Sequence, residues 1–306
     1  MAQRKARTTT RRPLLLFAAV VAAIVSVGAV LFAVQGGSSN EPGGLAVGDF
    51  PEPGVVHVHG LGIDPADGAL YAATHSGLFR LPASGRGAQR VANRYQDTMG
   101  FTVTGPRTFL GSGHPDARED DLRPPLLGLI ESTDAGNRWQ SLSLRGKADF
   151  HALHAAHGQV YGYNATSGSL MVSADRKRWE SRSRLPMRDF AVSPVDAEAL
   201  LATTEQGLAR SGDGGRTWAG VPDAPALSVV TWATAATIFG AGPDGSVYRS
   251  QDGGTSWVRR GATGGDAEAI AVDSRADVPT LYVAASGRGV LASTDGGTTF
   301  TTRYAE

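Results

Sequence analysis

Short apolar stretches bounded by turn residues recur along the chain from about residue 55 to its C-terminal end. Typical examples are residues 69–74 (ALYAAT) and 280–284 (TLYVA), each followed closely by a Ser-Gly pair. Runs of five or six residues that mix aromatic, small and β-branched side chains, separated by turn residues, are typical of β-strands. The pattern therefore predicts an all-β domain in this part of the chain.

One turn motif recurs five times in the C-terminal two-thirds of the chain. It has the form Ser-x-Asp-x-Gly-x-x-Trp, with Phe300 in place of Trp in the last copy, and its copies lie about 40 residues apart. The Asp carboxylate can accept backbone N–H groups, the glycines can adopt positive φ, and the aromatic ring can pack between strands. We therefore expect a structural hairpin turn at each copy, once per four-stranded propeller blade. The five aspartates are Asp134, Asp175, Asp213, Asp252 and Asp295.

These turns resemble the Asp-box (BNR) repeats of sialidases, sortilin-type ectodomains and photosystem assembly factors, all of which are β-propellers. The second copy departs from the pattern, because Arg176 and Lys177 replace the usual glycines. From His57 onward the chain also resembles membrane-anchored actinobacterial proteins that are labelled glycosyl hydrolases. The resemblance implies a propeller, but it leaves the activity open because one fold supports many functions.

Six segments of the chain qualify as the inner strands of blades. The count predicts a six-bladed β-propeller, with a seventh blade built partly from the preceding linker as the alternative. The first blade lacks the turn motif, since its third strand at residues 77–80 runs into Leu81-Pro82. The six segments are residues 57–63, 99–103, 150–153, 189–192, 227–230 and 268–272.

An uncharged apolar stretch near the N-terminus, residues 13–34, follows a segment rich in Arg. It is long enough to cross a bilayer as one helix, and the basic flank favours a cytoplasmic N-terminus. A cleaved secretory signal and a twin-arginine signal at Arg11-Arg12 are the alternatives. We therefore predict a single-pass protein of the cell membrane with its propeller on the extracytoplasmic side. Its parts are a basic cytoplasmic tail (1–12), a transmembrane anchor or signal (13–35), a flexible linker (36–50) and the propeller (51–306).

Charge and cysteine content exclude several classes of function. The chain has 29 Lys and Arg residues against 29 Asp and Glu residues, so no basic field indicates a nucleic-acid partner. It has no cysteine, which excludes disulfides, thiol catalysis and Cys-ligated zinc. Any metal site must use imidazole, carboxylate or thioether ligands.

All seven histidines lie between His57 and His157, within the first three predicted blades. In a four-stranded blade the inner strand begins at the face where the second and third strands are joined, opposite the Asp-box turns. We therefore expect several histidines at one mouth of the channel, within about 4–5 Å of a common centre, where imidazole, carboxylate and thioether groups would suit copper or zinc. Solvated turn histidines are the alternative. The candidate ligands are His59, His75, His114 and His151, with His57, Met99 and Asp97 as further candidates.

Two other functions are consistent with the sequence. A sialidase-like exo-glycosidase needs a nucleophile, an acid and an arginine cluster, for which the weak candidates are Tyr163, Glu205, Arg188 and Arg288. A non-enzymatic scaffold would bind a protein or a glycan on the same face. The acidic segment 116–121 lacks the regular spacing of a calcium loop, which favours a solvated charged loop over a calcium site.

Overall fold

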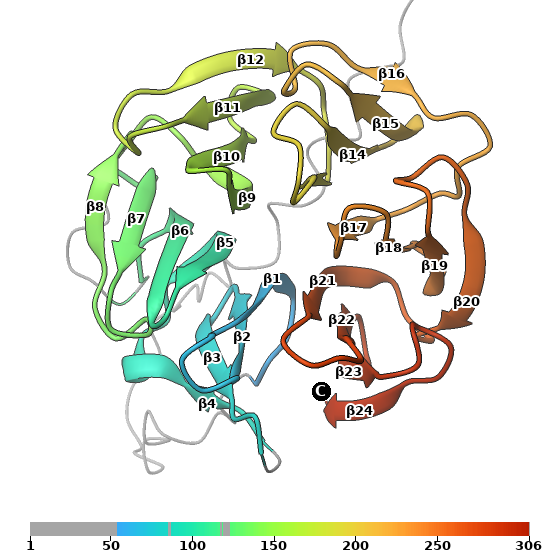
Figure 1. Cartoon of the computed structure of the whole chain (residues 1–306). Helices are drawn as coiled ribbons and strands as arrows, with labels where there is room; N and C mark the ends of the chain where they lie inside the picture. Colours follow the sequence, from blue (N-terminus) through green and yellow to red (C-terminus); the bar gives the residue numbers. More distant parts are fainter. Residues whose placement is uncertain (1–53, 85–86, 117, 119–122, 306) are drawn as a thin grey trace, which may run out of the picture. The chain divides into compact units, whose positions relative to one another are not determined.

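The structure is a computed structural model that describes residues 54–305 except 85–86, 117 and 119–122. The described residues form six four-stranded antiparallel sheets arranged as blades around a central axis (Figure 1). Each sheet uses four consecutive strands in chain order, so the predicted six-bladed propeller is confirmed. The inner strands are β1 (Val58–Ile63), β5 (Asp97–Gly105), β9 (Phe150–Ala156), β13 (Asp189–Val192), β17 (Val229–Trp232) and β21 (Ala267–Asp273).

The remaining strands follow the inner strand of each blade outward. The second strands are β2 (Leu70–Thr74), β6 (Thr108–His114), β10 (Gln159–Asn164), β14 (Leu200–Thr204), β18 (Ile238–Ala241) and β22 (Thr280–Ala285). The third strands are β3 (Gly77–Leu81), β7 (Leu129–Ser132), β11 (Ser169–Ser173), β15 (Gly207–Ser211), β19 (Ser246–Ser250) and β23 (Gly289–Ser293). The outer strands are β4 (Gln89–Arg90), β8 (Gln140–Ser143), β12 (Glu180–Arg184), β16 (Ala219–Gly220), β20 (Val258–Ala262) and β24 (Thr301–Tyr304).

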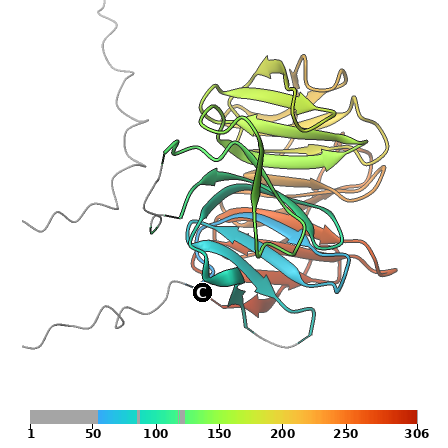
Figure 2. The same ribbon diagram turned by 90° about the vertical axis from the view of Figure 1, so that its left-hand side faces the viewer.

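Successive strands run in opposite directions between the two faces of the ring, as Figure 2 shows from the side. The face where the inner strands begin is called the top face here, and it also carries the turns between second and third strands. The Asp-box turns join third to fourth strands and therefore lie at the opposite, bottom face. Candidate ligands and structural aspartates are thus separated by the length of a strand.

The hydrophobic core lies between neighbouring blades. Between the first and last blades, Val58, Leu70 and Phe79 pack in one cluster with Ala284 and Val290. No sheet of the described residues combines strands from both ends of the chain, so packing of this kind closes the ring. Burial of apolar surface, rather than shared strand pairing, therefore stabilises the closure.

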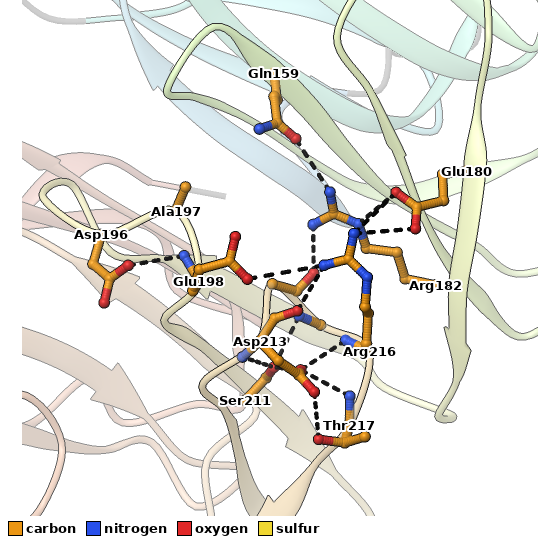
Figure 3. A network of polar contacts seen from close by, with 12 residues as sticks. Gln159, Glu180, Arg182, Asp196, Ala197, Glu198, Ser211, Asp213, Arg216 and Thr217 are labelled. Carbon is orange, nitrogen blue, oxygen red and sulfur yellow. Dashed lines mark hydrogen bonds and ion pairs between the residues drawn. The ribbon is translucent and has the colours of Figure 1, made fainter.

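The third Asp box shows how these turns are built (Figure 3). The buried hydroxyl of Ser211 donates to Asp213 Oδ1 and accepts from the Gly215 backbone N–H, both at 2.8 Å. Asp213 also accepts from Thr217, at 2.9 Å from the backbone N–H and 2.6 Å from the hydroxyl. Gly214 and Gly215 take φ values of 70° and 85°, which L side chains rarely adopt. The Asp213 carboxylate therefore accepts its hydrogen bonds from groups within the turn.

The same turn also links two blades. Arg182 of β12 donates to the Gly214 carbonyl at 2.6 Å, and Arg216 pairs with Glu180 at 3.2 Å (Figure 3). The indole N–H of Trp218 donates to the Ser183 hydroxyl of the preceding blade at 3.0 Å. In the degraded second copy Arg176 adopts φ 61° at the position of Gly214, whereas Lys177 does not take the positive φ of Gly215. The contacts of these boxes therefore join neighbouring blades.

The predicted cytoplasmic tail, membrane anchor and linker, residues 1–50, lie outside the described residues. Within the part that the structure describes, no helix has the length and apolar character needed to cross a membrane.

Candidate metal-binding site

A line of imidazoles and carboxylates crosses the top face of the first three blades. Its centre is Asp97, at the start of β5. Asp97 Oδ1 lies 2.9 Å from Nδ1 of His75 and 3.8 Å from Nε2 of His59, and Oδ2 lies 3.1 Å from Nδ1 of His114. One carboxylate therefore faces three of the predicted histidines.

β-Bulges set the direction of several side chains at the top face. The pairing register shifts between Val58 and Gly60, so His59 is the extra residue of β1. Equivalent shifts leave Met99, His151 and Glu268 unpaired at the starts of β5, β9 and β21. A bulge changes the direction of a side chain relative to regular alternation. His59, His151 and Glu268 line a central cavity of about 100 Å³ together with Arg188 and Asp189.

The His59 ring has an unpaired nitrogen and is uncharged at neutral pH. Its Nε2 atom is buried and has no hydrogen-bond partner. Burial, reinforced by the neighbouring charge of His75, lowers the pKa of His59 to about 4. The ring is therefore neutral at pH 7.

The other groups around Asp97 carry complementary charge. Burial alone would raise the pKa of Asp97, but hydrogen bonds from His114 and His75 outweigh it and hold that pKa well below its usual range. In return, the hydrogen bond to Asp97 raises the pKa of His75 and that of His114. Asp97 is therefore a carboxylate in the folded protein.

The four principal histidines divide into two groups. The nearest ligand atoms of His59, His75 and Asp97 all lie within 4.8 Å of one another. His114 and His151 approach a second carboxylate instead, since Asp149 Oδ2 lies 2.7 Å from His151 Nε2 and 3.8 Å from His114 Nε2. Sequence reasoning did not select Asp149, although Asp149 precedes His151 by the same two residues that separate Asp97 from Met99.

His57 and Met99 lie at the margin of this arrangement. The His57 side chain is 70% exposed, with its ring centre 5.8 Å from that of His75 and its Nδ1 4.0 Å from Glu268. Met99 has the bulged position of the second blade, but it is absent from the described residues that line the cavity. The ligand atoms that lie within 4.8 Å of one another are two imidazole nitrogens and one carboxylate oxygen.

The four hydrolase candidates lie in different surroundings. Tyr163 is 8% exposed and packs in the core between the third and fourth blades. Glu205 and Arg288 are exposed on the turns after β14 and β22. Arg188 alone among the four lines the described cavity, where it donates to the Ala267 carbonyl at 2.8 Å.

The acidic segment is described only in part. Asp116 accepts from the Tyr95 backbone N–H at 2.8 Å and pairs with Arg118 at 2.7 Å. Residues 117 and 119–122 lie outside the described residues, so the comparison between a calcium site and a charged loop stays a prediction.

Comparison with known proteins identifies the fold. No protein-family model and no curated protein matches the sequence. A solved nidogen/laminin complex aligns with 78% of this chain and 93% of the matched chain, at 11% identity and a TM-score of 0.60. A gluconolactonase from Xanthomonas campestris aligns over 74% and 82%, at 14% identity and a TM-score of 0.58. YCF48 from Cyanidioschyzon merolae aligns over 79% and 97%, at 12% identity and a TM-score of 0.53.

The chain also aligns with less than half of the length of two larger enzymes. The chain aligns with 37% of a GH74 xyloglucanase from Xanthomonas campestris, at 20% identity and a TM-score of 0.48. It aligns with 39% of an ancestral GH74 enzyme, at 15% identity and a TM-score of 0.52. At these identities the likeness concerns the β-propeller fold alone.

Proposed function

We propose that this protein binds a transition metal, zinc(II) or copper(II), at His59, His75 and Asp97 on the top face of its propeller. One observation carries the proposal: potential ligand atoms of three residues lie within 4.8 Å of one another, and His59 Nε2, which lies 3.8 Å from Asp97 Oδ1, is buried without a hydrogen-bond partner. A buried polar atom without a hydrogen bond is costly, and coordination would satisfy it.

The ligand set limits the choice of metal. Two imidazoles and a carboxylate suit zinc(II) or copper(II), whereas copper(I) prefers sulfur ligands. Because metal–ligand bonds are about 2 Å long, ligand atoms around a tetrahedral ion lie about 3.3 Å apart. Small rotamer changes bring the three side chains to that separation.

Three protein ligands leave a coordination position free, as in sites that accept an exogenous ligand. The His75 side chain is 52% exposed, so this position is open to solvent at the channel mouth. A metal-dependent partner would bind there through its own donor atom.

The proposal predicts that the purified full-length chain, stripped with a chelator, takes up zinc(II) tightly at pH 7.5. His75→Gln should weaken this uptake at least about tenfold, because it removes one ligand. Binding should also weaken below about pH 6, since protons compete for the imidazoles. Isothermal titration calorimetry measures each effect.

His157→Gln is the matched control for this measurement. His157 is an exposed histidine after β9, and its Nε2 lies 2.7 Å from the Ser193 carbonyl, outside the Asp97 group. Equal zinc affinity of the wild type, His75→Gln and His157→Gln would contradict the assignment.

A protein-binding scaffold is the second candidate function. It is favoured by similarity to a structure of YCF48 bound to a D1 peptide, which aligns over 83% of this chain and 84% of the matched chain at a TM-score of 0.51. Chelation separates the two functions, because a pure scaffold keeps its partner without metal. The Asp-box turns support kinship with sialidase-type propellers, but the burial of Tyr163 gives the exo-glycosidase alternative less support.

We also propose that the propeller lies outside the cytoplasmic membrane, anchored through residues 13–35. Support comes from the sequence, where basic residues precede an uncharged apolar stretch. Protease added to intact cells should digest the propeller and spare a tag placed at the N-terminus. Immunoblotting checks this. Digestion of the propeller only after cell lysis would contradict the proposed orientation and place the propeller on the cytoplasmic side.

A further inference from the structure

A second group of ligand-type side chains adjoins the site at Asp97. Asp149 immediately precedes β9, His151 is the bulged residue of that strand, and His114 ends β6. Asp149 Oδ2 lies 2.7 Å from His151 Nε2 and 3.8 Å from His114 Nε2. Two histidines from neighbouring blades thus approach one carboxylate.

The Asp149 carboxylate is only partly satisfied. Its side chain is 10% exposed, and its Oδ1 atom is buried with no hydrogen-bond partner. The backbone is held in place, because the Asp149 N–H donates to the Asn164 side chain at 3.1 Å. An unpaired carboxylate oxygen in a buried position is costly unless a cation or a donor meets it.

Asp97 orients the histidine of this group. Its Oδ2 lies 3.1 Å from His114 Nδ1, while His114 Nε2 points toward Asp149. A histidine that donates one ring N–H to a carboxylate and presents its other nitrogen is the usual arrangement of a metal-binding imidazole. Asp97 can therefore serve as a ligand of the first site through Oδ1 and as the outer partner of His114 through Oδ2.

We propose that His114, Asp149 and His151 form a second transition-metal site, so that the top face holds two zinc(II) or copper(II) ions side by side. This proposal rests on the proposed function of the first site. The two histidine nitrogens lie 2.7 and 3.8 Å from Asp149 Oδ2, on either side of the roughly 3.3 Å expected between ligands of one tetrahedral ion. Among the described residues only His59, His75 and Asp97 have all their ligand atoms within 4.8 Å of one another, so the second site also requires His114 and His151 to turn toward each other. The second ion takes the place of the hydrogen bond between Asp149 Oδ2 and His151 Nε2, releasing its proton to solvent, and it meets the buried Oδ1 when the carboxylate binds through both oxygens.

The test is the zinc stoichiometry of the full-length chain, purified in detergent, freed of metal with a chelator and then loaded with zinc(II). Native mass spectrometry of the wild type should show two bound ions. Asp149→Asn and His151→Gln should each retain one ion, as should His75→Gln through loss of the other site. The double change His75→Gln, His151→Gln should retain none, and His157→Gln should retain two.

The number of bound ions distinguishes failure of the second site from failure of both. One ion in the wild type, unaffected by Asp149→Asn and by His151→Gln, overturns the second site and leaves the first in place. No ion in the wild type overturns both. Thermal unfolding of every variant shows that it is folded, and of the two second-site residues changed, His151 at 36% exposure is less buried than Asp149 at 10%.

Discussion

Asp97→Asn should lower the zinc affinity of the first site by at least about 100-fold, because the change removes a charged ligand. Loss of an outer-shell partner alone typically costs 10–100-fold, and Asp97 has both roles here. Its two oxygens face His59, His75 and His114 at 2.9 to 3.8 Å. Asparagine preserves the shape but lacks the negative charge that holds these rings together.

The same change should lower the pKa of His75 and that of His114. The hydrogen bond to Asp97 is the largest cause that raises both values in the wild type, and burial opposes it. NMR titration of the metal-free protein measures these pKa values, and calorimetry measures the zinc affinity.

Asp266→Asn is the matched control for Asp97→Asn. Asp266 stands before β21 at the corresponding place in the last blade, and it pairs with Arg188 at 3.5 Å instead of with histidines. The control makes the same charge change and should leave zinc affinity near its wild-type value. An equal loss in both variants would indicate a general electrostatic effect and would contradict the role given to Asp97.

The architecture was predictable because it is repeated. An Asp-box turn at a spacing of one blade marks the end of the third strand in five of the six blades, and the alternating strand direction then assigns the remaining turns to a face. Ser211 and Asp213 illustrate why the motif can be recognised in the sequence, since their contacts lie within the turn itself. Local chemistry of this kind can be read from a sequence without knowledge of the remaining chain.

The sequence predicted on which face the histidines lie, but not which of them share a carboxylate. Alternation in a regular strand places His57 and His59 on one side, yet His57 precedes β1 with φ 50° and is largely exposed, while the bulge in β1 places His59 at the cavity. Bulges depend on how neighbouring strands pair, which residue spacing does not specify. Asp149 was missed for a related reason. One partner, His114, belongs to the neighbouring blade, and the other, His151, is directed toward Asp149 by a bulge that the sequence does not specify.

The hydrolase candidates show the same limit. Tyr163 lies next to the end of the second strand of its blade, close to where it was expected, but it packs in one cluster with Phe190 and Leu200 of the next blade. Whether a strand-end residue faces solvent depends on contacts between blades, and these pair positions far apart in the sequence. The membrane anchor and the extracytoplasmic location stay predictions.

In the metal-free protein, lowering the pH from about 6.5 to about 4 should cost the wild type about 3 kcal/mol of unfolding free energy relative to His59→Gln. Burial lowers the pKa of His59 from 6.5 to about 4 in the folded state. Below pH 6.5 the unfolded chain therefore binds a proton at His59 that the folded protein excludes, and stability falls until the folded ring also protonates near pH 4. A pKa lowered by about 2.5 corresponds at 1.36 kcal/mol per pH unit to between about 3 and 4 kcal/mol in full, of which about 3 kcal/mol is lost by pH 4, where the folded ring is half protonated.

Comparison with His59→Gln isolates this effect from opposing ones. The raised pKa values of His75 and His114 stabilise the fold below pH 6.5, and that contribution disappears as the pH rises through their folded values. Both histidines remain in the variant, so most of their contribution cancels in the difference. Urea unfolding of the two proteins at pH 7, 5.5 and 4, with a chelator present, gives the free energies. Parallel pH profiles would show that His59 titrates normally in the folded state, and the buried, neutral imidazole that the first metal site requires would then be absent.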